Sequence, residues 1–129
     1  MENKKLNVFI SQPIGKRSYY DMMDVNDRVM GKVKRYFETD NTFLIPSRWE
    51  PGTFLTNSKN DDLLWLSMSL NAMAYADVVV MATGWEESRI CRIEYTCARF
   101  YDIVVIFEDT NYITSENQFE VEHDSTASD

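Results

Sequence analysis

The sequence predicts an α/β fold, a three-layer sandwich in which a mainly parallel sheet of four or five strands lies between helices. Two observations carry this prediction. Short apolar runs rich in β-branched residues alternate with longer segments whose apolar residues recur at helical spacing. The run at residues 77–82 is apolar almost throughout, which is typical of a central parallel strand. Because parallel neighbours need long crossover connections, the alternation indicates β-α-β units.

Turn-forming and capping residues mark the ends of these elements. Gln12, Pro13 and Gly15 end the first strand, and Ser18 and Asp21 have the spacing of a capping box at the start of the first helix. The expected strands are residues 6–11, 42–45, 77–82 and 103–107, with a further edge strand at 118–122, and the expected helices are residues 18–38, 60–75 and 87–101.

The segment between the second strand and the second helix, residues 47–60, is rich in turn formers but also carries Trp49 and Phe54. It is either a lid over a ligand or a surface loop packed against the fold. The lid is the interpretation that we favour.

The chain has room for one domain, residues 1–109, followed by an acidic tail, residues 110–129. At 129 residues, 44% of them hydrophobic, one core is expected. The net charge of -8 belongs to the end of the chain, because residues 1–107 carry 14 acidic and 13 basic side chains, whereas the rest carries 7 acidic ones and no Lys or Arg. No basic stripe is left for a nucleic-acid polymer. A solvated tail is expected, with a docked regulator as the alternative.

Composition also argues against several other chemistries. There is no long apolar run for a membrane span, and the N-terminus leads into a strand instead of a signal peptide, so we expect a cytoplasmic protein. Cys91 and Cys97 lie on one expected helix with the spacing of neither a metal motif nor a disulfide framework. The single histidine, His123, lies in the tail, so neither a histidine metal site nor a Ser-His-Asp triad is expected. We expect no metal and no cofactor.

The third expected helix carries a carboxylate on its apolar face. That face comprises Ile90, Ile93, Glu94, Cys97, Ala98 and Tyr101. Burying a carboxylate is costly unless it is paired, hydrogen-bonded or facing a pocket. The pattern therefore predicts that Glu94 lies in a cleft. The alternative is a position on the rim, with Glu94 paired to an arginine of a neighbouring element.

Three loops are expected to meet where a ligand binds such a sheet, outside the carboxyl ends of the strands and near the point where strand order reverses. They are residues 11–15, 46–52 and 83–88. Gly84 and Ser88 lie in a strand-to-helix turn that would present backbone N–H groups to an anion.

Four separated motifs, in this order, resemble the nucleoside 2-deoxyribosyltransferase-like superfamily, and most of all its small bacterial and phage branch. The motifs are Phe9-Ile-Ser-Gln-Pro13, Ala76-Asp-Val-Val-Val80, Gly84-Trp-Glu-Glu-Ser-Arg89 and Arg92-Ile-Glu94. The resemblance spans residues 6–107 and implies a flavodoxin-like, Rossmannoid fold.

The resemblance also implies cleavage or transfer at an N-glycosidic bond, with Glu94 attacking the anomeric carbon. A carboxylate nucleophile would split a difficult displacement into two easier steps, and a position near a helix N-terminus would help to keep it ionised. Trp85 could stack on a base or sugar, with packing against the lid as the alternative. Gln12 could hydrogen-bond to either part of the ligand.

Three positions depart from the pattern of the superfamily. Ser69 stands where its enzymes commonly carry an aspartate that helps to protonate the leaving base, Phe9 replaces a frequent tyrosine, and Ile90 replaces a glycine. These departures favour a second hypothesis, a protein that binds a nucleotide or an ADP-ribose-like signal without turning it over. A third hypothesis is an interaction module that uses the acidic tail.

The candidate site thus has Glu94 as its catalytic residue. The candidate binding residues are Ser11, Gln12, Pro13, Ser69, Gly84, Trp85 and Ser88. The expected partner is a nucleoside or nucleotide, not a nucleic-acid polymer or a membrane. The resemblance implies a homodimer or larger homo-oligomer, and the aromatic surplus on one small domain agrees with that.

Overall fold

The computed structural model describes residues 4–15, 18–46 and 57–109. Its four strands form one sheet in the order β2-β1-β3-β4, in which every neighbouring pair is parallel. The strands are β1 (Leu6–Ser11), β2 (Thr42–Leu44), β3 (Val78–Met81) and β4 (Val104–Phe107). The predicted α/β class with a parallel sheet is confirmed.

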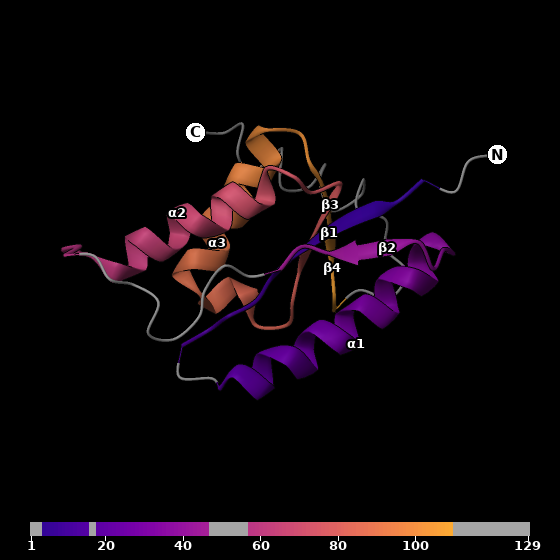
Figure 1. Ribbon diagram of the computed structural model, residues 1–129, viewed down its shortest axis with the longest axis horizontal. Helices are drawn as coiled ribbons and strands as arrows, with labels where there is room; N and C mark the ends of the chain where they lie inside the picture. Colours follow the sequence, from indigo (N-terminus) through magenta and orange to yellow (C-terminus); the bar gives the residue numbers. More distant parts are fainter. Residues whose placement is uncertain (1–3, 16–17, 47–56, 110–129) are drawn as a thin grey trace.

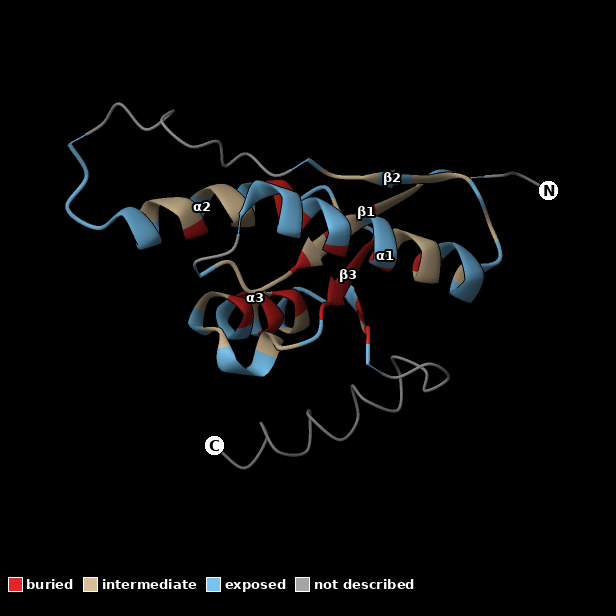
Figure 2. Cartoon of the chain, turned by 90° about the horizontal axis from the view of Figure 1, so that it is seen from below, coloured by how far each residue is buried: buried red, intermediate tan, exposed pale blue. Residues whose placement is uncertain are grey.

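Three helices complete the three layers (Figure 1). They are α1 (Tyr19–Phe37), α2 (Asp61–Met73) and α3 (Arg89–Phe100). One face of the sheet packs against α1 through a cluster of valines that includes Val25, Val29 and Val33. The other face packs against α2 and α3 through residues such as Ala72 and Tyr95. Figure 2 shows buried residues along β3 and on the sides of the helices that face the sheet.

The expected helix starts are largely confirmed, with one difference. Ser18 forms a complete capping box with Asp21 at the start of α1, and Asn60 accepts a hydrogen bond from the backbone of α2. The third helix begins later than predicted, because Trp85–Glu87 form a separate 3-10 turn, η1, and the Ser88 hydroxyl then caps α3. The strand-to-helix turn is therefore longer than helical periodicity alone indicates.

The strand order locates the switch point of the sheet. From β1 the chain crosses by α1 to β2 on one side, and later by α2 to β3 on the other side of β1. Strand order therefore reverses between β1 and β3, where Ser11 is in register with Met81. Parallel sheets of this kind bind ligands at the carboxyl ends of such neighbours.

Some expectations fall outside the described residues. They are the edge strand at 118–122, the acidic tail and all but the last four residues of the segment 47–60. Within the described ranges, no helix is both long enough and apolar enough to cross a membrane.

Candidate active site

Glu94 is a buried carboxylate beneath the carboxyl end of β1. Glu94 is 4% exposed. Its Oε1 accepts a hydrogen bond of 2.6 Å from the hydroxyl of Ser11, the last residue of β1. The carbonyl oxygen of Ser11 accepts the N–H of Ala82 at 2.9 Å, so the serine is tied to both β3 and α3. This burial is compatible with the predicted position in a cleft, and it contradicts the alternative of a position on the rim.

The protonation of Glu94 departs from the expectation that a helix N-terminus keeps it ionised. Burial raises the pKa of Glu94 to about 7, and hydrogen bonds from Ser11 and Ser69 only partly oppose that rise. Glu94 lies five residues after Arg89, the first residue of α3, whereas the field of a helix end fades within its first turn. Desolvation therefore dominates, and Glu94 exchanges a proton close to neutral pH.

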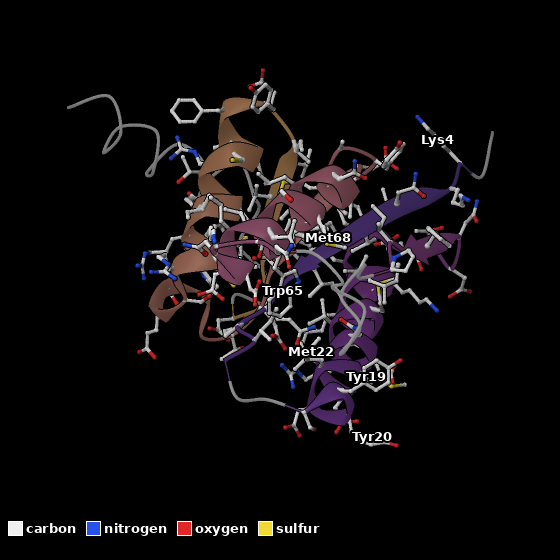
Figure 3. The ribbon with its side chains drawn as sticks, turned by 60° about the vertical axis from the view of Figure 1, so that its left-hand side comes forward. Lys4, Tyr19, Tyr20, Met22, Trp65 and Met68 are labelled. Carbon is white, nitrogen blue, oxygen red and sulfur yellow. The ribbon has the colours of Figure 1, made fainter. Side chains whose placement is uncertain are left out.

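A cavity of about 60 Å³ adjoins Glu94, which is room for about two water molecules. Its polar lining residues are Gln12, Asn26, Ser69 and Glu94. Its apolar lining residues are Phe9, Ile10, Ile14, Met22, Leu44, Ile45, Trp65, Met68, Ala72 and Ile90. Figure 3 labels Met22 on α1 and Trp65 and Met68 on α2, which contribute to this lining from two different helices.

A second, more open hollow of about 220 Å³ shares part of this lining. The two spaces have Gln12, Ile14, Trp65 and Ile90 in common, and the outer one adds Gly15, Asp62, Ser88 and Arg89. Arg89 donates a hydrogen bond to Asp62 at 3.2 Å across its rim. We call the first space the inner cavity and the second the outer hollow. The shared lining shows that the two spaces are neighbours.

Gln12 is held in a defined orientation at the inner cavity. Its Nε2 donates to Asn26 Oδ1 at 2.9 Å and to the carbonyl oxygen of Met22 at 3.4 Å. Its Oε1 is buried and accepts no hydrogen bond from the protein. Asn26 is absent from our sequence prediction, although its spacing offered a signal. It lies four residues after Met22 on the apolar stripe of α1, where a polar side chain is as unusual as Glu94 on α3.

The turn after β3 supports the site more than it lines it. Gly84 has φ 90°, and a Cβ at this glycine would lie 3.5 Å from Cγ of Pro13, so the two loops are in contact. The hydroxyl of Ser88 caps α3, and this serine lines the outer hollow. The structure thus brings Ser11 into contact with Glu94 and places Gln12 and Ser69 in the lining of the same cavity as Glu94. Ser88 lines only the outer hollow, and Gly84 contacts Pro13.

Trp85 lines neither the inner cavity nor the outer hollow. Its ring lies 4.9 Å from that of Tyr95 and 5.7 Å from that of Phe107, centroid to centroid. Both partners belong to the core between the sheet and α3. The indole therefore packs in an aromatic cluster, as large rings in a small core commonly do.

A second buried carboxylate, Glu108, is also absent from our sequence prediction. Burial alone would raise its pKa, but hydrogen bonds from Arg28, the Thr83 backbone and Lys32 outweigh burial and lower the pKa to about 2. Glu108 thereby joins α1 to the turn after β3. Its place directly after an apolar strand was the available signal.

Fold and site together define an α/β protein with a buried carboxylate at the switch point of a parallel sheet. Compared with protein-family models, with curated proteins and with solved structures, the chain matches none of them. Among the described residues, no group of His, Cys, Asp or Glu side chains is arranged to hold a metal ion.

Proposed function

We propose that this protein hydrolyses or transfers the glycosyl group of a nucleoside or nucleotide, with Glu94 as the nucleophile. The observation that supports it best is the buried Glu94 carboxylate, which adjoins a cavity at the switch point and accepts a hydrogen bond from Ser11. A carboxylate in such a place can attack a carbon centre from a water-poor environment.

In the proposed reaction, a carboxylate oxygen of Glu94 attacks the anomeric carbon and forms a glycosyl ester. The bond from that carbon to the base nitrogen breaks, and its electron pair leaves with the base, which takes a proton from water. A water molecule or a second base then attacks the same carbon and loses a proton to the hydroxide that the first step left. The ester bond breaks, and Glu94 is released as a carboxylate. Ser11 and Ser69 hold the carboxylate through hydrogen bonds in its resting state.

The size of the inner cavity constrains how a nucleoside would bind. About 60 Å³ is well below the ~300 Å³ of the smallest usual ligand pockets. We propose that the sugar occupies a widened inner cavity and that the base extends into the outer hollow. Ile14, Trp65 and Ile90 line both spaces, so movement of their side chains would join them.

The second candidate function is binding without turnover. Ser69 supports it, because this serine lines the inner cavity beside Glu94 and a serine hydroxyl is a poor acid for a leaving base at neutral pH. The ligand would again be a nucleotide or an ADP-ribose-like compound.

We also propose that the protein works as a cytoplasmic homo-oligomer. Support comes from a surface at the ends of α2 and α3, where Tyr75, Phe100 and Tyr101 are between 66% and 79% exposed. A hollow of about 440 Å³, lined by residues such as Met73 and Ile103, lies beside them. Light scattering on the purified protein tests this, and a monomer at tens of micromolar would contradict it.

The main experiment incubates the protein with a panel of nucleosides, nucleotides and NAD-like compounds and follows the free base by chromatography. Glu94→Gln is expected to lower base release by at least about 1000-fold, because it removes the nucleophile with little change in volume. Glu87→Gln, an exposed change in η1, is the matched control and should release base at the wild-type rate.

Two outcomes separate the candidates. If the wild type releases no base but retains a nucleotide through purification, binding without turnover replaces the enzyme proposal. If base is released and Glu94→Gln releases it equally fast, Glu94 is not the nucleophile.

A further inference from the structure

The amide of Gln12 presents an acceptor to the inner cavity and keeps its donors occupied. The carbonyl oxygen of Met22 can only accept, so the Gln12 atom that faces it is the amide nitrogen. The same nitrogen donates to Asn26 Oδ1 at 2.9 Å. Both contacts fix the same orientation of the amide and leave Oε1 for another partner.

The Oε1 atom of Gln12 is buried without a hydrogen bond from the protein. Leaving a buried acceptor unpaired destabilises the folded state, so such atoms commonly have a ligand or a water as partner. Gln12 lines both the inner cavity and the outer hollow. A ligand that moves inward from the surface would therefore pass this acceptor on its way to Glu94.

The polar lining of the inner cavity favours a neutral hydrogen-bond donor over an anion. Its polar lining residues are Gln12, Asn26, Ser69 and Glu94, none of them cationic. Asn26 Oδ1 already accepts from Gln12, and the Ser69 hydroxyl lowers the pKa of Glu94, so its interaction is with that carboxyl group. A phosphate here would meet no positive side chain and a buried acid, whereas an O–H or N–H group would meet an acceptor that lacks a donor.

We propose that Gln12 selects the ligand of this site by accepting a hydrogen bond at Oε1 from a neutral O–H or N–H donor, with Asn26 as the residue that positions its amide. The inference rests on the proposed function, and it narrows the substrate class. The group that reaches Gln12 is an unphosphorylated sugar hydroxyl or an amino group of the base.

The test measures dissociation constants by calorimetry for adenosine and for analogues that each lack one donor. The analogues are 2′-deoxyadenosine, 3′-deoxyadenosine and purine riboside. Cytidine and its analogues with the corresponding deletions are measured in the same way. One deletion is expected to weaken binding to the wild type by about tenfold or more. If the donor is a sugar hydroxyl, the nucleoside monophosphate that carries its phosphate on that hydroxyl should bind no better than the analogue that lacks the hydroxyl. The identity of the damaging deletion tells whether sugar or base supplies the donor.

Variants of the protein complete a double-mutant cycle with these ligands. Gln12→Met keeps the length of the side chain and removes the acceptor, so it should bind the parent and the deleted analogue equally well. Asn26→Leu should also reduce the preference, because the amide loses its anchor. Asn26→Asp keeps the acceptor for Nε2 and should restore the preference, which a purely structural role of Asn26 does not predict. Circular dichroism checks that each variant is folded.

Free ribose, free adenine and free cytosine, measured in parallel, separate failure of this inference from failure of the proposed function. If nucleosides lose base in the presence of wild type while Gln12→Met keeps the full preference for the donor, the inference is overturned and the function stands. Ribose or a free base could instead bind to wild type more tightly than to Gln12→Met, while no nucleoside binds or reacts. In that case the inference stands and the function is overturned. Binding of none of these compounds would overturn both.

Discussion

The hydroxyl of Ser11 donates a hydrogen bond of 2.6 Å to the carboxylate of Glu94, although the two residues are 83 positions apart in the chain. One residue ends β1 and the other lies in the middle of α3, so the contact joins the sheet to the helix at the switch point. Because the carboxylate is buried, this short polar contact governs both the stability and the chemistry that can be expected of the site.

The first prediction is that wild-type stability falls with rising pH in a way that depends on Glu94. The pKa of Glu94 is raised from 4.5 to about 7 on folding, so between these values the folded state holds a proton that the unfolded state has lost. The associated stability is present below about pH 4.5 and is lost as the pH rises through 7. The full pKa shift corresponds to about 3 kcal/mol in the free energy of unfolding.

Glu94→Gln should remove most of this pH dependence, because the amide stays neutral and its Oε1 can still accept from Ser11. At pH 8 the variant should therefore be more stable than wild type by about 2 kcal/mol, and at pH 4 the two should be similar. Urea denaturation across this range measures the effect. Parallel pH curves for the two proteins would contradict the prediction.

The second prediction concerns the two serines that donate to Glu94. Their hydrogen bonds favour the ionised carboxylate and lower its pKa against the effect of burial, so Ser11→Ala and Ser69→Ala should each raise it further. Carbon-13 NMR of labelled glutamate side chains follows the titration directly. Ser67→Ala is the control, because Ser67 is exposed on α2 and donates to a backbone carbonyl oxygen instead. An unchanged or lowered pKa in both variants would refute the role of the serines.

The third prediction is that Glu108 makes the fold sensitive to acid. Its pKa is lowered on folding from 4.5 to about 2, so its contribution is present above pH 4.5 and is lost as the pH falls through 2. Glu108→Gln should cost about 2 kcal/mol at pH 7, since Arg28 and Lys32 are partly exposed and solvent weakens their attraction.

The measurement for Glu108 is the free energy of unfolding at pH 7 and at pH 3. Glu108→Gln should narrow the difference between these two values relative to wild type, whereas Glu87→Gln, an exposed change, should leave it as it is. Equal acid sensitivity of all three proteins would contradict the assignment.

The fourth prediction uses two glycines whose replacement by alanine should have opposite effects. Gly84 has a φ of 90°, where any side chain is strained, so Gly84→Ala should destabilise the protein by about 1–2 kcal/mol. Gly31 lies inside α1, and an added Cβ would lie 3.7 Å from Nη1 of Arg35, an ordinary van der Waals contact. Gly31→Ala should therefore stabilise by about 0.5–1 kcal/mol. Thermal unfolding of the pair is the test, and effects of the same sign would contradict it.

Much of the fold could be predicted because the relevant signals are local. Apolar runs and helical spacing identified all four described strands and all three helices, and the capping residue Ser18 lies where expected. Glu94 was predicted to be buried for the same reason, since one acidic residue interrupts an apolar stripe on α3. The start of α3 was predicted too early, because a 3-10 turn has nearly the same spacing of apolar residues.

The partners of each polar group could not be predicted, because they come from segments distant in the chain. Whether Trp85 faces a ligand or the core depends on the positions of Tyr95 and Phe107. Whether Ser69 is a weak replacement for an acid or a hydrogen-bond donor to Glu94 depends on how α2 packs against α3.

The sequence by itself determined the order of strands and helices and the presence of a buried acid on α3. Only the tertiary structure decided that Glu94 is held by serines, that Gln12 has an unpaired acceptor and that Glu108 joins α1 to the turn after β3. The physical reason is that periodicity depends on neighbours along the chain. Desolvation and hydrogen bonding depend on neighbours in space.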